Sequence, residues 1–336
     1  MKIGIIGFSR YFRRAYAPYL RKHPEHTLGA ICDILASDEL EAVIKEAELP
    51  SIPTFAEFQE MLRQVELEGV IISTPHIYHY RQVRACLLAG LHVFVDKPLA
   101  CCYDEAAELV EMASSRNLKL AVANQRRYEA PYQYVRKQIQ HAMFGEIKHI
   151  NYLFSNSPWH NYSQHWRGDV TLNGGGAMMD IGYLAIDTLA WILDQPFQEV
   201  YASAHREGQF EYSAAILAKF APNTLVNLTV SYLAPKPSVQ EILSIYGTKG
   251  SIFTRRFQPK RSPSPPTVAE QYENGEFHEV SFVGDAENWR PLEDFLLAVE
   301  NKTPIVCDGQ SSLPTIQFIE AVYQAISESC IVYAKK

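Results

Sequence analysis

The first third of the chain alternates short apolar runs with stretches that have helical spacing. The apolar runs are rich in β-branched residues and occupy residues 3–6, 28–32, 70–72, 92–95 and 118–122. Uninterrupted apolar strands of this kind are typical of a parallel sheet that helices cover on both faces. The stretches between them predict helices at residues 11–22, with a kink at Pro18, and at 38–48, 55–64, 78–89 and 104–117. This order predicts a doubly wound α/β domain over residues 1–123.

From residue 124 onward the pattern changes to longer segments in which polar and apolar residues alternate. The alternation predicts antiparallel strands at residues 147–154, 199–205, 214–220, 224–231 and 240–246. Helices are expected at residues 131–141, 178–193, 289–300 and 313–333, and the proline-rich stretch 257–267 predicts a surface loop. We therefore expect residues 124–336 to form an α+β domain with a large open, mostly antiparallel sheet.

Composition narrows the class of protein. The chain has 336 residues, of which 47% are hydrophobic, enough to build two buried cores. A net charge of -7 and a pI near 5.9 argue against a nucleic-acid partner. The chain opens directly into a predicted strand rather than a secretory signal, and no apolar run reaches the ~20 residues of a membrane span. The six cysteines lack C-x-x-C spacing. These features predict reduced thiols, a cytoplasmic protein and no membrane partner.

The predicted first strand runs into a modified dinucleotide-binding fingerprint. Gly7, Ser9 and Phe12 occupy the three glycine positions of G-x-G-x-x-G, so only the first is glycine. In that motif the glycines make the turn, let the backbone approach a pyrophosphate, and let helix and strand pack closely. Either the chain binds a dinucleotide in a modified way, or it keeps the fold without the ligand. For binding, we expect contacts from Gly7, Phe8, Ser9 and Arg10, with the Ser9 hydroxyl near the pyrophosphate.

Asp33 ends the second predicted strand, where an acidic side chain takes a ribose hydroxyl in dinucleotide-binding domains. The alternative is that Asp33 caps the next helix. Ile34 and Leu35 follow it rather than an arginine, which favours NAD over NADP. Arg10 weakens this preference, because it lies in the predicted phosphate turn and could reach a phosphate.

Polar residues also follow the strand at 70–72. Ser73, Thr74 and Pro75 are expected to pack on a nicotinamide ribose, because ligands lie at the carboxyl ends of parallel strands. His76 and His79 open the next helix with H-x-x-H spacing. Without a nearby carboxylate or thiol, we expect these histidines to act as caps or hydrogen-bond partners, with His79 close to the cofactor, rather than to hold a metal.

Asp96, Lys97 and Pro98 directly follow the strand at 92–95. A lysine at a strand end, beside a positive nicotinamide ring, can have its pKa lowered enough to exchange a proton with a substrate hydroxyl. The simpler interpretation of Lys97 alone is an exposed lysine in a turn.

A set of motifs along the whole chain resembles the glucose-fructose oxidoreductase, inositol dehydrogenase and MocA family. The motifs that carry the resemblance are Thr74-Pro75, Val95-Asp96-Lys97-Pro98-Leu99-Ala100, Gln125-Arg126-Arg127-Tyr128, the glycine-rich segment from Gly174 to Gly182 followed by Asp187, the segment from Ile245 to Ser251, and Asp308-Gly309. The resemblance implies a Rossmann domain followed by a sheet domain that makes the oligomer contact. It also implies NAD(P)-dependent oxidation or reduction of sugars, polyols or related hydroxy compounds.

The resemblance also implies roles for individual residues. Lys97 would contact the reacting hydroxyl, and Asp180 would bind substrate or orient the proton-transfer group. The residues expected to bind the cofactor are Gly7, Phe8, Ser9, Arg10, Asp33, Ser73, Thr74, Pro75, His79, Asp96, Lys97, Gln125 and Arg127. The residues expected to bind substrate are Trp166, Arg167, Tyr183 and Asp187. No metal ligand is expected. The alternative interpretations are a flexible loop for the glycines and a first-turn helix carboxylate for Asp180.

One position departs from the family pattern. The histidine that relays the proton in D-x-G-x-H-x-x-D would fall at residue 184, which is leucine and cannot act as an acid or base. Tyr183 would point about 100° away around the helix. Lys97, His165 or a water held by Asp180 could take the role. Asp187 lies seven residues after Asp180, so both carboxylates are expected on one helix face, although Asp187 could instead tie the helix to the sheet.

Three functions fit these residues. The first is an NAD(P)-dependent dehydrogenase or reductase acting on CH–OH groups of a sugar-like or cyclic polyol substrate. The second is a catalytically impaired member of the family that binds a dinucleotide or sugar as a regulatory protein. The third is a reductase of a non-sugar double bond, for which Leu184 would be harmless. The aromatic-rich segment 156–173, with Trp159, His160 and Tyr162, suits a sugar ring. An open sheet with one uncovered face predicts a homodimer or homotetramer.

Overall fold

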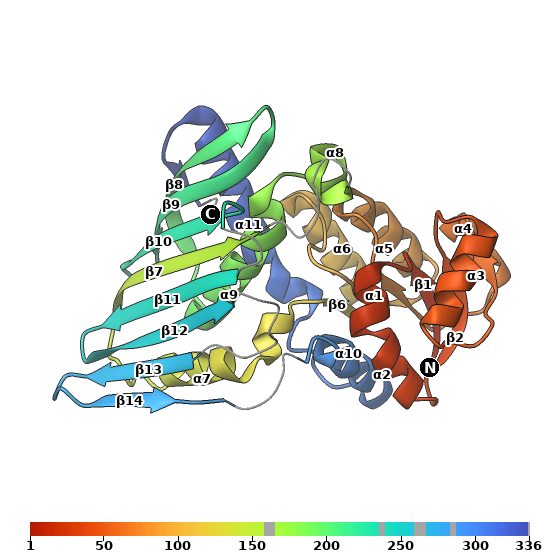
Figure 1. Cartoon of the computed structure of the whole chain (residues 1–336), viewed down its shortest axis with the longest axis horizontal. Coiled ribbons are helices and arrows are strands. Elements are labelled where there is room, and N and C mark those ends of the chain that lie inside the picture. The colour runs from red at the N-terminus through yellow and green to blue at the C-terminus, as the bar shows by residue number, and fades with distance from the viewer. Residues whose placement is uncertain (158–164, 235–238, 259–266, 283–286, 335–336) are drawn as a thin grey trace. The chain divides into compact units, whose positions relative to one another are not determined.

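The computed structural model describes residues 1–157, 165–234, 239–258, 267–282 and 287–334. The chain divides into two compact units. The first contains Met1–Gln125 and Asn288–Leu313, and the second contains Arg126–Glu287 and Pro314–Lys336. Figure 1 labels the helices and strands of both units.

The first unit is built on a parallel six-stranded sheet with the order β3-β2-β1-β4-β5-β6. This is the strand order of a doubly wound dinucleotide-binding domain, so the predicted Rossmann fold is confirmed. Its strands are β1 (Lys2–Ile6), β2 (Thr27–Cys32), β3 (Thr54–Phe55), β4 (Gly69–Ile72), β5 (His92–Val95) and β6 (Leu120–Val122). Its helices are α1 (Arg10–Ala15), α2 (Ala17–Lys22), α3 (Ser37–Glu46), α4 (Phe58–Gln64), α5 (His79–Leu88) and α6 (Tyr103–Ser115), with the 3-10 turn η1 (His76–Tyr78). The 3-10 turn η2 (Gln125–Tyr128) begins at the last residue of this segment and continues into the second unit.

One local prediction in this unit was wrong and another is refined. The kink expected at Pro18 is a break between two helices that meet at Tyr16, because Pro18 occupies the first turn of α2, where its missing N–H costs no hydrogen bond. The start of the expected helix at 55–64 is the short strand β3, which pairs with the end of β2. The helix α4 begins only at Phe58.

Residues 288–313 belong to the first unit, which corrects the prediction that residues 124–336 form one continuous domain. The segment contains α10 (Arg290–Asn301). Its apolar face, including Phe295 and Leu296, is buried in the same core as Ile5 and Phe94, and the rings of Phe94 and Phe295 lie 5.7 Å apart. An amphipathic helix after the second sheet therefore completes the core of the first.

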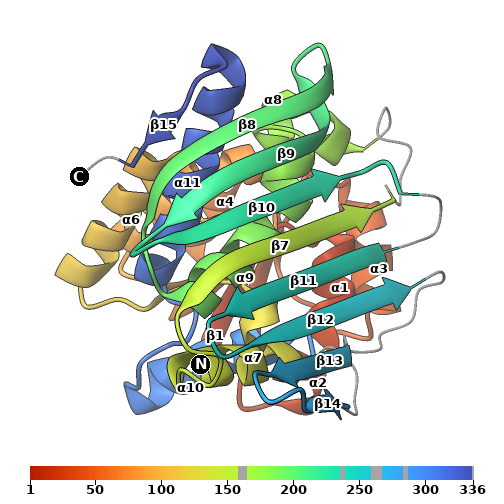
Figure 2. The same ribbon diagram turned by 90° about the vertical axis from the view of Figure 1, so that its left-hand side faces the viewer.

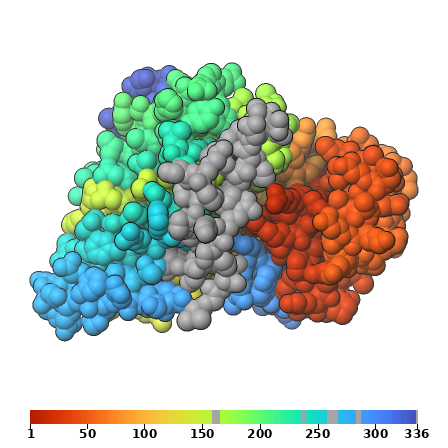
Figure 3. All heavy atoms as spheres, viewed as in Figure 1, coloured from red at the N-terminus to blue at the C-terminus, as the bar shows by residue number. Residues whose placement is uncertain are grey.

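The second unit is built on a nine-stranded sheet with the order β14-β13-β12-β11-β7-β10-β9-β8-β15. Strands β7 and β10 are parallel and every other neighbouring pair is antiparallel, which confirms the predicted mostly antiparallel sheet. The strands are β7 (Ile147–Asn156), β8 (Phe197–Glu207), β9 (Phe210–Phe220), β10 (Thr224–Ser231), β11 (Val239–Gly247), β12 (Gly250–Gln258), β13 (Thr267–Tyr272), β14 (Phe277–Val280) and β15 (Val332–Tyr333). Strands β13 and β14 form one edge, coloured light blue in Figure 3.

Helices cover one face of this sheet, and in the described part of the chain none lies on the face turned toward the viewer in Figure 2. The helical elements are α7 (Ala130–Gln140), η4 (Trp166–Gly168), α8 (Val170–Asn173), the π-helical turn η5 (Met178–Gly182), α9 (Tyr183–Leu193) and α11 (Gly309–Glu328). Along β10 the burial alternates as expected, with Val226, Leu228 and Val230 buried and Leu225 53% exposed.

Three differences from prediction remain in this unit. Strands β12 to β15 were not expected, and the predicted helix at 313–333 ends at Glu328, before β15. Only the ends of the predicted loop at 257–267 can be compared, since residues 259–266 lie outside the described residues. The helical stretch Val170–Leu193 is long and apolar enough to suit a membrane span, contrary to the prediction from uninterrupted runs. However, 78% of its most apolar window is buried inside the protein, as in a core helix.

Candidate functional site

The turn after β1 requires glycine at Gly7. Its φ is +86°, and a Cβ atom would lie 2.7 Å from the carbonyl oxygen of Ser73. The Gly7 N–H donates to the Cys32 carbonyl oxygen at 2.8 Å, which fixes the turn against the end of β2. The first fingerprint glycine is therefore kept for both its backbone conformation and its close contact with the end of β4.

The other two fingerprint positions have local structural roles. Ser9 caps α1: its Oγ accepts from the Phe12 backbone N–H at 3.0 Å and lies 2.7 Å from Ser73 Oγ. Phe12 is fully buried and packs against Phe8, with ring centroids 5.3 Å apart. Phe12 therefore contributes to the core of the first unit. The Ser9 hydroxyl, expected near a pyrophosphate, is engaged within the turn itself.

Asp33 holds the same turn from the end of β2. Its Oδ2 accepts from the Phe8 backbone N–H at 2.6 Å, and its Oδ1 accepts from the Leu35 N–H at 3.0 Å. The alternative role as a helix cap was wrong, because α3 begins at Ser37 with Ala36 at its N-cap. The Phe8 side chain is 2% exposed and its N–H is bound to Asp33, so its expected contact with a cofactor is not seen in the turn. Arg10 is exposed at the first position of α1.

A chain of hydroxyls and one carboxylate joins this turn to the lysine motif. Ser73 donates to Asp96 Oδ2, and Tyr16 donates to Asp96 Oδ1 at 2.6 Å. Ser9 reaches the same chain through Ser73. Burial, together with the Asp96 charge, raises the pKa of Tyr16 well above its ordinary value, so its hydroxyl stays a donor. Two donors from different parts of the chain therefore fix the carboxylate of Asp96, the residue that immediately precedes Lys97.

His79 fixes the other side of the lysine motif. It is fully buried, its Nδ1 lies 2.6 Å from the Pro98 carbonyl oxygen, and its Nε2 lies 2.9 Å from the Thr74 carbonyl oxygen. His79 therefore bridges the segments after β4 and β5, as expected for a hydrogen-bond partner, because both ring nitrogens face backbone carbonyls. Its contact with the cofactor stays a prediction. Among the described residues, no group of three or more histidine, cysteine, aspartate or glutamate side chains could hold a metal.

Several predicted site residues have simple placements. Thr74 Oγ1 donates to Gln82 at 2.6 Å, which holds the segment after β4 against α5. Pro75 precedes η1, and Lys97 and Gln125 are partly exposed after β5 and at the start of η2. The structure thus brings Gly7, Ser9, Asp33, Ser73 and Asp96 together around the carboxyl ends of neighbouring parallel strands.

Asp180 is the centre of a polar cluster in the second unit. Its Oδ2 accepts from the Tyr232 hydroxyl at 2.6 Å, and its Oδ1 lies 3.5 Å from Arg167 Nε. The Arg167 guanidinium lies over the Trp166 ring, 4.2 Å from its centroid. The His165 ring stacks on the Trp166 ring, and His165 Nδ1 accepts from the Arg167 backbone N–H at 3.3 Å. The structure therefore brings the predicted residues Trp166, Arg167 and Asp180 together.

The glycine-rich segment before Asp180 is closely packed rather than a flexible loop. Glu211 Oε1 accepts from the N–H groups of Gly176 and Met178, at 2.8 and 3.0 Å, and from the Tyr323 hydroxyl at 2.8 Å. A Cβ on Gly176 would lie 2.3 Å from the Glu211 carbonyl oxygen. Burial raises the pKa of Glu211, while its three donors favour the ionised form. One buried side chain thus fixes the backbone that leads into the π-helical turn.

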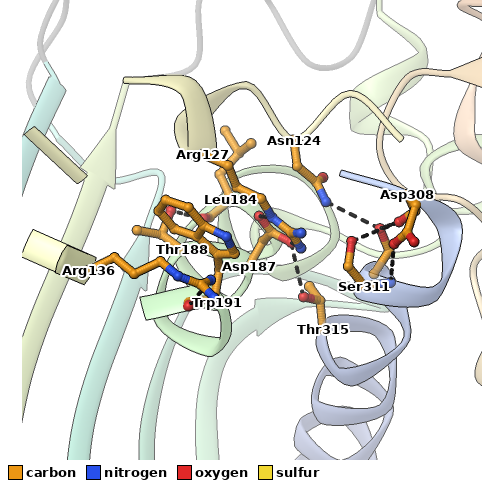
Figure 4. A network of polar contacts seen from close by, with 11 residues as sticks. Asn124, Arg127, Arg136, Leu184, Asp187, Thr188, Trp191, Asp308, Ser311 and Thr315 are labelled. Carbon is orange, nitrogen blue, oxygen red and sulfur yellow. Dashed lines mark hydrogen bonds and ion pairs between the residues drawn. The ribbon is translucent and has the colours of Figure 1, made fainter. Parts of the chain in front are cut away.

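Arg127 and Asp187 form a buried ion pair (Figure 4). Their side chains are 1% and 2% exposed, and Arg127 Nε and Nη2 donate to the two carboxylate oxygens at 3.0 and 2.6 Å. Thr315 Oγ1 also donates to Asp187, at 3.2 Å. The pair ties α9 to η2 and α11, close to the alternative that the sequence left open for Asp187. The cofactor role of Arg127 and the substrate role of Asp187 stay predictions.

Asp180 lies within the π-helical turn Met178–Gly182, and Asp187 lies on α9. The two carboxylates bind different partners. Tyr183 is fully buried, and its contact with substrate stays a prediction. Leu184 lies on the first turn of α9, where its carbonyl oxygen accepts from Thr188 Oγ1 at 2.7 Å (Figure 4). Trp159, His160 and Tyr162 lie outside the described residues.

Sequence reasoning missed Tyr232 and Glu211. Each carried a detectable signal: Tyr232 directly follows a predicted strand, and Glu211 is a carboxylate in an otherwise apolar strand region. The pairing of either residue with the glycine-rich segment depends on contacts between positions far apart in the sequence.

Two family models match the chain. One is described as an oxidoreductase family with an NAD-binding Rossmann fold and matches residues 1–124, and the other is the GFO/IDH/MocA C-terminal domain and matches residues 132–253. The chain belongs to the GFO/IDH/MocA family. The resemblance inferred from the motifs is thus confirmed.

Individual members of the GFO/IDH/MocA family are distant in sequence. Two uncharacterised oxidoreductases of Schizosaccharomyces pombe are each 29% identical, over 63% and 58% of this chain but only 60% and 52% of their own lengths. A dTDP-3,4-didehydro-2,6-dideoxy-alpha-D-glucose 3-reductase of Streptomyces antibioticus is 24% identical over 89% of this chain and 88% of its own. The WlbA dehydrogenase of Bordetella pertussis, solved with NADH and UDP-GlcNAcA, superposes with a TM-score of 0.83 at 20% identity, covering 100% of this chain and 99% of its own. This last similarity shows the fold.

Proposed function

We propose that this protein is an NAD(P)-dependent oxidoreductase that transfers a hydride between nicotinamide and a CH–OH group of a sugar-like or cyclic polyol substrate. The observation that carries the proposal is the immobilised lysine motif. Asp96 is held by Ser73 and Tyr16, and the Pro98 carbonyl by His79, so the backbone on both sides of Lys97 is fixed. A lysine in a turn without a chemical task would not require this support.

The residues of the first unit suit a dinucleotide. Gly7 has the conformation and close packing of the fingerprint turn, and Asp33 lies where the family pattern places the ribose-binding carboxylate. Gly7, Ser9, Arg10, Asp33, Ser73 and Thr74 would hold the cofactor. The bound cofactor would supply the hydride acceptor or donor. Within the chain, Lys97 would donate a hydrogen bond to the reacting oxygen and share its proton, while Asp180 would bind substrate hydroxyls.

NAD is the expected cofactor, in preference to NADP. The carboxylate of Asp33 would repel a 2′-phosphate, and Ile34, which is 96% exposed, and Leu35 offer it no positive partner. Titration calorimetry should show tighter binding of NADH than of NADPH, and Asp33→Asn should bring the two affinities closer together. Lack of saturable binding of either dinucleotide at millimolar concentration would exclude the proposed activity.

The role of Lys97 can be tested separately from cofactor binding. Lys97→Ala should lower turnover by about 100-fold or more while leaving NADH affinity within a few fold, because the lysine acts on the transition state. Arg84→Ala provides a control, since Arg84 pairs with Glu108 on the unit's surface. Unchanged turnover in Lys97→Ala would exclude the assigned role.

Trp166 and Arg167 support a sugar-like substrate. The indole ring, with the guanidinium 4.2 Å from its centroid, combines an apolar platform with hydrogen-bond donors, as sugar sites require. A panel of aldoses, cyclic polyols and nucleotide sugars, assayed by absorbance of reduced nicotinamide at several pH values, would identify the substrate class.

A second function is supported by Leu184. A protein without the relay histidine could bind a dinucleotide or sugar without turnover and act as a regulator. The same panel separates the alternatives, because a regulator would bind NADH but oxidise or reduce none of the compounds. A double-bond reductase would act only on unsaturated substrates.

We also propose a homodimer or homotetramer located in the cytoplasm. The uncovered face of the nine-stranded sheet carries exposed apolar side chains, among them Tyr201, Leu217, Leu225, Ile242 and Phe257. Light scattering should give a mass of two or four chains. All six cysteines are free thiols, and burial raises the pKa of Cys86 to about 12, which suits a reducing compartment.

A further inference from the structure

We propose that Tyr232 is a positioning residue for Asp180 and compensates for the leucine at position 184. This inference rests on the proposed function, in which Asp180 binds substrate hydroxyls. Tyr232 directly follows β10 and is 3% exposed. Its hydroxyl donates to Asp180 Oδ2 at 2.6 Å, a short hydrogen bond between a neutral donor and a carboxylate.

The two oxygens of Asp180 face different partners. Oδ2 meets the Tyr232 hydroxyl, and Oδ1 lies 3.5 Å from Arg167 Nε, too far for a strong hydrogen bond. The two oxygens are equivalent, but rotation of the carboxylate out of its present plane would break the shorter contact. Tyr232 therefore fixes the plane of the carboxylate and directs Oδ1 toward the Trp166-Arg167 segment, the part of the second unit that suits a sugar ring.

The backbone of Asp180 is fixed independently. Glu211 binds the N–H groups of Gly176 and Met178, and the Asp180 N–H donates to the Gly176 carbonyl oxygen at 3.3 Å. With the backbone held by Glu211, the remaining freedom of Asp180 is the rotation of its side chain. That rotation is what the Tyr232 hydroxyl restricts.

Leu184 gives this restriction its importance. In the family pattern a histidine at this position relays the proton beside the aspartate, whereas leucine has no donor or acceptor in its side chain. Asp180 then has to meet the substrate hydroxyl without that second group. A carboxylate fixed in advance loses less freedom when substrate binds and keeps its geometry during the reaction.

The test is a double-mutant cycle between Tyr232→Phe and Asp180→Ala. Tyr232→Phe removes one hydroxyl and should lower kcat/KM by about 10- to 100-fold, the range for a hydrogen bond to a charged group. Most of the loss should be in kcat, and NADH affinity should stay within about twofold, because Tyr232 acts on the second unit's carboxylate. In the Asp180→Ala background, which has no side-chain acceptor, Tyr232→Phe should have no further effect.

Tyr212→Phe is the matched control. Tyr212 lies on the neighbouring strand β9, and its hydroxyl donates at 3.3 Å to Glu207, so this variant should keep wild-type kcat. If Tyr232→Phe is not folded, as judged by near-UV circular dichroism, Tyr232→Met repeats the cycle. Suppose that the wild type is active. If Tyr232→Phe then leaves kcat and KM unchanged, or if the losses of the two single variants add in the double variant, the role of Tyr232 is overturned while the proposed function stands. A wild type without turnover on any compound would overturn the proposed function and this inference with it.

Discussion

The buried pair of Arg127 and Asp187 allows a structural role to be separated from a ligand-binding role. Both side chains are at most 2% exposed, and the guanidinium contacts both carboxylate oxygens. Asp187→Asn would leave the Arg127 charge buried without its counter-charge. Removing one partner of such a pair costs about 3–5 kcal/mol, a large part of the ~5–15 kcal/mol that stabilises a typical domain.

Urea denaturation followed by circular dichroism should reveal this loss. With an m value of about 3 kcal/mol per molar urea, the midpoint should fall by about 1 M or more. Replacing both partners, with Arg127→Met and Asp187→Leu, should restore most of the stability, because no charge then remains buried. Asp194→Asn is the control: its side chain is 73% exposed and lies 3.4 Å from Arg136, so it should cost less than about 1 kcal/mol.

A different result would refute the reasoning. If Asp187→Asn stayed within about 1 kcal/mol of the wild type while turnover was lost, Asp187 would act on a ligand and not on the packing of α9. Failure of the double variant to recover stability would show that the carboxylate is needed for more than its pairing with Arg127.

Three further changes test other parts of the structure. Ser9→Ala should cost about 1 kcal/mol by removing the cap of α1, whereas Ser9→Gly, which restores the second fingerprint glycine, should cost only a few tenths; equal losses in thermal denaturation would contradict the capping role. Gly176→Ala should destabilise the second unit by about 1–3 kcal/mol, because its Cβ would lie 2.3 Å from the Glu211 carbonyl oxygen. Gly208→Ala, which meets open space at φ +60°, measures the cost of backbone strain alone. His92 Nδ1 accepts from the Lys119 N–H at 2.9 Å, and burial lowers its pKa. The folded state therefore binds fewer protons than the unfolded state, so stability should fall as the pH drops below about 6.5, by at most about 1.4 kcal/mol per pH unit. His92→Asn should flatten this dependence in urea titrations between pH 5 and 7.

The sequence predicted the sheet architecture because hydrophobic periodicity is a local property. The runs at 3–6 and 92–95 are buried strands, and 224–231 is β10 at the same bounds. The periodicity did not predict that α10 packs into the first unit, because its amphipathic pattern specifies an apolar face without specifying the surface that covers it. It also missed β13 and β14 at the sheet edge, which are short and in which half of the residues are polar.

The candidate site was predicted in part for the same reason. Motifs identified Lys97, Asp96 and Asp180, which occur in recognisable local patterns. They could not show that Arg127 and Asp187 neutralise each other, or that Asp180 lies in a π-helical turn. The first feature depends on pairing across 60 residues, and the second on a local change of helical hydrogen bonding.

The two departures from the family pattern have different consequences once their surroundings are known. Ser9 replaces a glycine whose absence would weaken a phosphate turn, but its hydroxyl caps α1 and extends through Ser73 to Asp96. Leu184 replaces a group that takes part in chemistry, and no side-chain hydrogen bond can be made by leucine. A protein that no longer bound the cofactor would not need hydrogen bonds that fix the residues on both sides of Lys97. Tyr16, Ser73 and His79 all make such hydrogen bonds. The fingerprint change is therefore compatible with dinucleotide binding, and the more informative position is 184, where activity depends on how firmly Tyr232 holds Asp180.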